Sequence, residues 1–137
     1  MKQKILVADD QLYVHRLIQH RLEEEEYQIV TARDGCELLE IAAREAPDLV
    51  VMDVMMPRMD GLTALRHLRR NETTRTVPVI VLTSSPHELV REEAEFSGAD
   101  LVLSKPFSPT RLLQEVRRLV SPNAERTPGH SRRPDRQ

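Results

Sequence analysis

Several residue types and patterns are scarce in this chain of 137 residues, and each absence excludes a class of protein. A single cysteine, Cys36, rules out an internal disulfide and is typical of a reducing compartment. No apolar run reaches transmembrane length, and the opening MKQKILVADD lacks the apolar core and cleavage site of a signal peptide. We therefore expect a small soluble domain in the cytoplasm, without membrane contact.

A strong excess of one charge is also missing, because the formal net charge is −2 with both signs mixed along the chain. No overall field then attracts nucleic acid or an anionic membrane. The basic residues after position 120 are sparse and have no aromatic residues between them. We expect no direct binding of nucleic acid.

Five short apolar runs alternate with segments of helical periodicity. The runs are KILVAD, YQIVTA, DLVVMD, VPVIVLTS and ADLVLSK, which begin at residues 4, 27, 48, 77 and 99. Between and after them, apolar residues recur at the spacing of a helix face, and Leu17, Leu89 and Phe96 are among those expected to face the core. Strands alternating with helices indicate an α/β fold with a parallel sheet covered on both faces.

The composition changes after Val120. The segment SPNAERTPGHSRRPDRQ holds three prolines and scattered basic residues, with almost no apolar side chains. Such a segment cannot bury enough apolar surface to offset the entropy lost on ordering. We predict a globular domain over residues 1–120 and a disordered C-terminal tail over residues 121–137, and we expect no output domain in this chain.

Polar side chains stand at the carboxyl ends of four of the five expected strands. Asp9 and Asp10 follow the first strand, Asp53 ends the third, Thr83 ends the fourth and Lys105 follows the fifth. In open α/β sheets, ligands bind at this edge. A carboxylate after a run as apolar as VVM is costly unless a partner or a cation compensates its charge. We therefore expect these five side chains to form one site.

The charges of the expected site indicate which cation fits it. Asp9, Asp10 and Asp53 together carry −3 and Lys105 returns +1, which leaves −2. Mg²⁺ prefers hard oxygen ligands and commonly uses few carboxylates together with water and phosphate oxygens. A carboxylate beside such a cation and a lysine suits nucleophilic attack on phosphorus, with formation of an aspartyl phosphate.

Each of these features has a simpler explanation when it is taken alone. An acidic pair after a strand often caps the next helix, a lysine before a proline is ordinarily solvated, and a threonine in a β-branched run is ordinary strand composition. Their convergence at the strand ends favours a site. His15 and His20 are five residues apart, which is not the spacing of a metal pair on one helix face, and we expect both at the surface.

With these residues, the chain resembles the response-regulator receiver domain of bacterial two-component signalling, the family of the chemotaxis regulator. The resemblance covers about residues 3 to 120 and includes the acidic pair, MPRMDG after the third strand, and KPF after the fifth. It implies a flavodoxin-like, five-stranded parallel sheet in the order 2-1-3-4-5.

The resemblance also implies a role for each site residue. Asp53 would be the phosphoacceptor, and Mg²⁺ would be held by the three aspartates and the backbone carbonyl of Met55. Thr83 would be the switch hydroxyl, and Lys105, followed by a cis peptide to Pro106, would pair with the phosphoryl group.

These roles imply a signalling switch rather than an enzyme with a separate substrate, although the domain would catalyse its own phosphorylation and slow dephosphorylation. The phosphoryl group would come from a sensor histidine kinase or a histidine phosphotransfer protein. A downstream protein would dock on the fourth helix, fifth strand and fifth helix. We expect a single-domain response regulator, with the receiver part of a longer regulator as the alternative.

Three other classes are less consistent with the sequence. A haloacid-dehalogenase-type phosphatase needs a second acid two residues after its nucleophile, where this chain has Met55. A dinucleotide-binding domain needs a glycine-rich turn after the first strand, and ADDQLY contains no glycine. A pseudo-receiver used only for docking would have lost an acidic residue, the threonine or the lysine, and all are present.

Three positions depart from many members of the family. Met55 and Ser85, two residues after the phosphoacceptor and the threonine, offer little to orient a hydrolytic water, so we expect slow dephosphorylation. Val102 replaces an aromatic residue three positions before the lysine. Because its χ1 is restricted, it cannot swing between two pockets, and Thr83 should carry most of the coupling.

Overall fold

The computed structural model describes residues 2–84 and 88–120, apart from the side chains of residues 12 and 13, and it confirms the expected alternation of strands and helices. The strands are β1 (Lys4–Ala8), β2 (Gln28–Ala32), β3 (Leu49–Asp53), β4 (Val79–Thr83) and β5 (Leu101–Ser104). The helices are α1 (Leu12–Glu24), α2 (Gly35–Glu45), α3 (Gly61–Arg70), α4 (Glu88–Ser97) and α5 (Pro109–Val120). The predicted tail, residues 121–137, lies outside the described residues.

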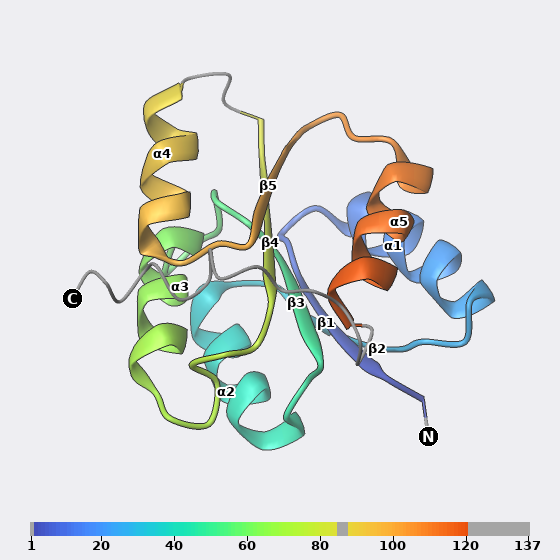
Figure 1. Cartoon of the computed structure of the whole chain (residues 1–137), viewed down its shortest axis with the longest axis horizontal. Helices are drawn as coiled ribbons and strands as arrows, with labels where there is room; N and C mark the ends of the chain where they lie inside the picture. Colours follow the sequence, from blue (N-terminus) through green and yellow to red (C-terminus); the bar gives the residue numbers. More distant parts are fainter. Residues whose placement is uncertain (1, 85–87, 121–137) are drawn as a thin grey trace.

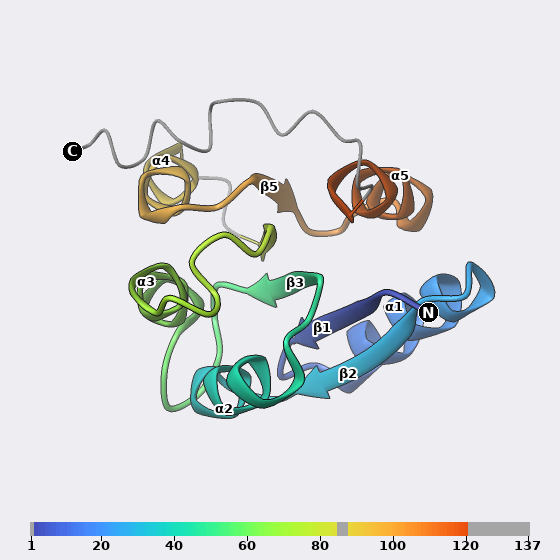
Figure 2. The same cartoon turned by 60° about the horizontal axis from the view of Figure 1, so that its bottom comes forward.

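The strands form one parallel sheet in the order β2-β1-β3-β4-β5, as predicted (Figure 2). The register pairs Ala8 with Met52, Asp53 with Leu82, and Thr83 with Ser104. The carboxyl ends of β1, β3, β4 and β5 therefore lie level along one edge of the sheet, and the polar residues that follow them are brought together.

Helices cover both faces of the sheet. In Figure 1, α2, α3 and α4 lie on one side of the strands and α1 and α5 lie on the other. Each face has its own apolar core, and every residue of β3 and β4 is buried between the two. This burial explains why these strands are continuously apolar rather than alternating. No helix of residues 2–84 and 88–120 is long and apolar enough to cross a membrane.

Side-chain caps mark the starts of three helices. Asp34 accepts a hydrogen bond from the backbone N–H of Glu37 at α2, and Asp60 accepts one from Thr63 at α3. Ser108 accepts one from Arg111 at α5. These caps satisfy N–H groups that have no partner within the helix. The sequence SPHE, residues 85–88, also has the pattern of a helix start before α4, but residues 85–87 lie outside the described residues.

Several side chains differ from the expected pattern. His15 is only 6% exposed, so its predicted surface position is wrong, whereas His20 is exposed as predicted. The buried stripe of α1 is Val14, Ile18 and Leu22, and His15 lies beside it, while Leu17 faces outward. On α4, Leu89 and Phe96 are also exposed rather than buried. In α1 and α4, the buried stripe is therefore narrower than the full set of apolar residues.

Candidate functional site

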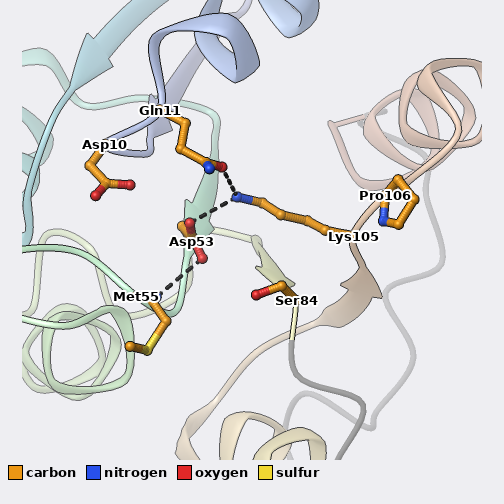
Figure 3. Close-up of a pocket in the computed structure, with 7 residues that line it drawn as sticks. All are labelled: Asp10, Gln11, Asp53, Met55, Ser84, Lys105 and Pro106. Carbon is orange, nitrogen blue, oxygen red and sulfur yellow. Dashed lines mark hydrogen bonds and ion pairs between the residues drawn. The ribbon is translucent and has the colours of Figure 1, made fainter.

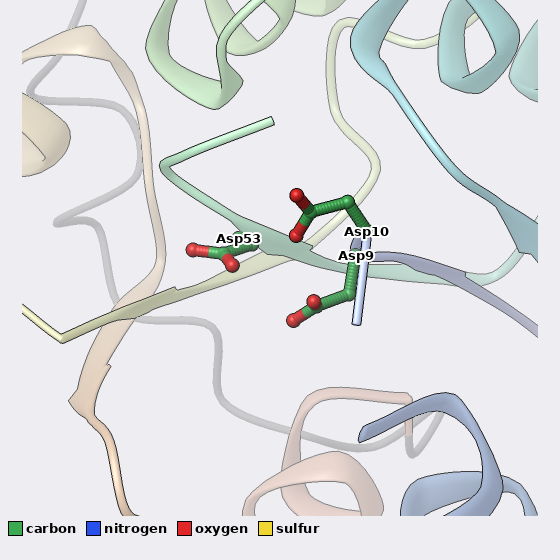
Figure 4. A group of neighbouring side chains, drawn as sticks. All are labelled: Asp9, Asp10 and Asp53. Atoms are coloured by element: carbon green, nitrogen blue, oxygen red, sulfur yellow. The ribbon is translucent and has the colours of Figure 1, made fainter. Parts of the chain in front are cut away.

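Three aspartates converge at the carboxyl edge of the sheet (Figure 4). Asp9 and Asp10 follow β1, Asp53 ends β3, and these two strands are neighbours. One carboxylate oxygen from each residue lies within 4.8 Å of the other two, with Asp9 and Asp53 buried and Asp10 exposed. This close set of hard oxygen donors, partly shielded from water, is consistent with a Mg²⁺ site.

Lys105 reaches this triad from the end of β5 (Figure 3). Its ammonium nitrogen lies 2.9 Å from each of three acceptors, which are Asp9 Oδ2, Asp53 Oδ2 and Gln11 Oε1. Its backbone N–H donates to the carbonyl of Thr83 at 2.7 Å, which fastens the loop to β4. A lysine ammonium has three N–H donors, so all three are used in this arrangement.

The electrostatics of the site leave negative charge in excess. Burial raises the pKa of the Asp53 carboxyl and outweighs the lowering effect of the hydrogen bonds from Lys105 and from the Met55 N–H, while the charge of Asp9 raises it further. Burial disfavours the charged form of Lys105, but its bonds to Asp53 and Asp9 outweigh this effect and the pKa of Lys105 is raised. One firmly charged ammonium therefore faces three carboxyl groups.

A pocket of about 440 Å³ opens beside these groups. Its lining residues are Asp10, Gln11, Asp53, Met55, Ser84, Lys105 and Pro106. The Met55 side chain is 67% exposed, and the peptide bond between Lys105 and Pro106 is cis, as the resemblance implied. Thr83 is buried beside the pocket, and Ser84, the next residue, contributes to the wall.

The loop after Asp53 is held closely against the end of β3. The N–H of Gly61 donates to the carbonyl of Val54 at 2.8 Å, and a Cβ on Gly61 would lie 2.2 Å from the carbonyl oxygen of Asp53. A larger residue is therefore excluded there, which explains the glycine of MPRMDG. Arg58 forms an ion pair with Asp34, so the same loop is also tied to the start of α2.

All the predicted side chains lie at this edge, together with one that sequence reasoning missed. Gln11 contacts Lys105 through its side chain, and its backbone N–H donates to Asp9 Oδ1 at 2.8 Å. Its position directly after the acidic pair is the signal that could have drawn attention to it. The sequence alone gives no indication that its side chain turns towards Lys105.

Comparison with known proteins agrees with this geometry. The sequence model of the family described as "Response regulator receiver domain" matches residues 5–117. The alkaline phosphatase synthesis transcriptional regulatory protein PhoP of Bacillus subtilis is 38% identical over 120 residues, which cover 88% of this chain and 49% of PhoP. This chain spans about half or less of the length of the curated relatives that it matches.

Solved structures show the same fold. The chemotaxis response regulator CheY4 of Vibrio cholerae matches with a TM-score of 0.81 and 30% identity, over 87% of this chain and 99% of CheY4. The receiver domain of the sensor histidine kinase PA1611 of Pseudomonas aeruginosa, which has a magnesium ion coordinated in its active site cleft, also matches with a TM-score of 0.81 and 30% identity, over 88% and 98% of the two chains. Together with the strand order and the acidic triad, these matches show that the chain belongs to the response regulator receiver domain family.

Proposed function

We propose that this domain is a phosphorylation-dependent switch in which Asp53 accepts a phosphoryl group from a histidine kinase or a histidine phosphotransfer protein. The observation that carries the proposal is the position of Asp53. Its carboxylate is buried at a strand end, close to those of Asp9 and Asp10, and 2.9 Å from the ammonium of Lys105. Receiver domains pair with histidine kinases, which supports a phosphorylated histidine as the donor.

In the proposed transfer, a carboxylate oxygen of Asp53 forms a bond to phosphorus as the bond between phosphorus and the donor histidine nitrogen breaks. The donor imidazole, protonated at its other nitrogen, leaves as a neutral ring. Lys105 would donate to the oxygens of the transferring group. Because Asp53 must act as a carboxylate, the hydrogen bond from the nearby ammonium also favours its ionised form and partly offsets the rise in pKa that burial causes.

Asp9, Asp10, Asp53 and the backbone carbonyl of Met55 would hold Mg²⁺. When bound, this ion offsets the excess negative charge and stabilises charge on the equatorial oxygens of the transferring group. The triad supports this assignment through its oxygen donors and its close spacing. The magnesium ion in the active site cleft of the PA1611 receiver domain supports it by similarity.

Phosphorylation would replace a charge of −1 by one of about −2 and add strong acceptor oxygens. Thr83 and Lys105 are the groups proposed to respond, and Thr83 would approach the pocket by a shift of the end of β4. Val102 is buried in β5, which agrees with a fifth strand that stays nearly still. Amide exchange with and without beryllofluoride and Mg²⁺ tests this, and a largest change centred on Val102 would contradict it.

The partner surface is proposed to lie on α4, β5 and α5. Leu89 and Phe96 are 76% and 80% exposed, and they lie seven residues apart, which places them on one side of α4. Exposed apolar side chains on one face favour contact with another protein. Whether the domain acts alone or within a longer regulator does not alter the chemistry proposed at Asp53.

Intact-mass measurements with acetyl phosphate test the function. We expect one phosphoryl group per chain in the presence of Mg²⁺, none in a chelator, and none in Asp53→Asn. Labelling that persists in Asp53→Asn, or that proceeds fully without a divalent cation, would refute the assignment.

A further inference from the structure

Gln11 is placed at the start of α1 but does not use its side chain to cap the helix. Its backbone carbonyl accepts from the N–H groups of Val14 and His15 at 3.0 and 3.3 Å, while its side chain makes no capping hydrogen bond. The carboxamide instead turns into the pocket and its oxygen accepts from Lys105 Nζ at 2.9 Å (Figure 3). The side chain is therefore available to serve the site rather than the helix.

The contact has a defined chemical direction. A lysine ammonium only donates hydrogen bonds, so the oxygen of the carboxamide must be the atom that faces it. Gln11 also donates its backbone N–H to Asp9 Oδ1, while Asp9 Oδ2 accepts from Lys105. Asp9, Gln11 and Lys105 thus form a closed ring of hydrogen bonds beside Asp53.

We infer that Gln11 is a positioning residue that fixes the Lys105 ammonium over Asp53 for phosphoryl transfer. Of the three acceptors around this ammonium, Asp53 receives the phosphoryl group and Asp9 belongs to the acidic triad. Gln11 has neither task and carries no charge, so its bond can persist while the other two rearrange. The inference rests on the proposed function and assigns that site a residue for which the resemblance implied no role.

The physical reason lies in the flexibility of lysine. Its ammonium ends a stem of four methylene groups, and phosphoryl transfer depends chiefly on placement of charge. When the Asp53 bond is given up, Asp9 alone would leave the ammonium free to turn about one contact. A second fixed acceptor on α1 limits that motion. The Gln11 bond has a neutral acceptor and lies at an exposed position, so its loss should change the rate about three- to tenfold.

Two substitutions that keep the length of the Gln11 side chain separate a role in positioning Lys105 from a role in packing. Gln11→Met keeps the size of the side chain and removes the acceptor oxygen, whereas Gln11→Glu keeps an oxygen that can accept. The matched control is Gln19→Met, because Gln19 lies on the same helix and its side chain bonds only to exposed Glu23 among the described residues.

Two quantities should be measured in each variant. The first is the rate of phosphorylation by acetyl phosphate at saturating Mg²⁺, and the second is the rate of hydrogen exchange of the Lys105 ammonium by NMR. The chain has only three lysines, Lys2, Lys4 and Lys105, so that signal can be assigned.

Gln11→Met should lower the rate constant extrapolated to saturating acetyl phosphate about three- to tenfold. It should also speed exchange at Lys105. Gln11→Glu should keep the wild-type rate constant and the slow exchange at Lys105. Because its added negative charge repels acetyl phosphate, the concentration of acetyl phosphate that gives half the maximal rate should rise. Equal behaviour of Gln11→Met, Gln19→Met and the wild type would overturn the inference, and so would equal slowing by Met and Glu. A wild type that is not phosphorylated would overturn the proposed function first, and the inference with it.

Discussion

Two clusters of charge, each with buried members, lie at opposite edges of the same sheet and differ in how well their charges are balanced. At the carboxyl edge, Lys105 faces Asp9, Asp10 and Asp53. At the amino edge, Asp100 lies just before β5 and forms an ion pair with Arg69 of α3, with 3.2 Å between Nη2 and Oδ2.

The amino-edge cluster is neutral and richly hydrogen-bonded. Arg69 also donates to the carbonyls of Val77 and Gly98, and Asp100 accepts from the N–H of Val79. The carboxyl-edge cluster keeps a formal charge of −2, from three aspartates and one lysine. Removal of one partner from a buried ion pair is strongly destabilising, whereas an uncompensated excess of partly buried charge costs stability and creates affinity for a cation. The charges at the amino edge therefore serve the stability of the fold, whereas those at the carboxyl edge form the proposed site.

The largest effect is expected from Arg69→Met. This change removes the Arg69 guanidinium from buried Asp100 and the donors to several loop carbonyls. Removal of one partner of a buried pair costs about 3–5 kcal/mol. Chemical unfolding should show this loss, while Arg70→Met, at the exposed neighbouring position, should change the free energy of unfolding little. Equal losses in the two variants would remove the distinction between the edges.

Asp53→Asn should stabilise the domain rather than destabilise it. We expect its melting temperature to rise by a few degrees at neutral pH without Mg²⁺. The pKa of Asp53 is raised, chiefly by burial, so the folded state binds its proton more readily than the unfolded chain does. Stability therefore falls as pH rises from the ordinary value of 3.8 through the raised pKa, and the ionised carboxylate is a penalty at neutral pH. The variant removes that penalty, and its advantage should shrink as the pH is lowered.

Asp34→Asn is the matched control, because the same substitution at this position should lower the melting temperature instead of raising it. The hydrogen bond from the Glu37 N–H lowers the pKa of Asp34, burial opposes it, and the charge of Arg58 lowers it further. This carboxylate therefore adds stability above its ordinary pKa of 3.8, and the contribution is lost as pH falls through the lowered value. Asparagine still caps a helix, so the variant isolates the charge and should melt lower at neutral pH. Melting shifts of the same sign in both variants would contradict the comparison.

Met55→Asn should act on function and leave stability nearly unchanged. Met55 is exposed at the pocket, and its thioether gives a hydrolytic water little to bond to. An amide there should orient the water and speed the loss of phosphate from Asp53 several-fold, whereas Met55→Leu should match the wild type. Ser85, the other residue expected to slow dephosphorylation, lies outside the described residues. Decay in Met55→Asn that is equal or slower would refute this explanation.

Truncation after Val120 should have the smallest effect. Val120 is the last residue of α5, and its carbonyl already accepts from Gln3 Nε2 at 2.9 Å. The melting temperature and the phosphorylation rate should stay essentially unchanged, as the composition of residues 121–137 predicts. A drop of several degrees would show that this segment packs on the domain.

The carboxyl edge could be predicted from the sequence, whereas the amino edge could not. Asp53 and Lys105 directly end or follow apolar strands, so the geometry of a parallel sheet brings them together. Arg69 is one of several basic residues in RHLRR, and its carbonyl partners lie in loops whose paths no periodicity encodes. The turn of Gln11 into the pocket and the burial of His15 likewise depend on packing between elements.

Chemical mapping of the phosphorylated residue tests most directly whether the charge excess at the carboxyl edge serves phosphoryl transfer. Borohydride reduces an aspartyl phosphate to homoserine, which marks the modified position in a peptide digest. After treatment with acetyl phosphate and Mg²⁺, homoserine is expected at position 53 and in no chelator-treated sample. Homoserine at Asp9, at Asp10 or at any other carboxylate, or its absence from position 53, would contradict the proposed role of Asp53.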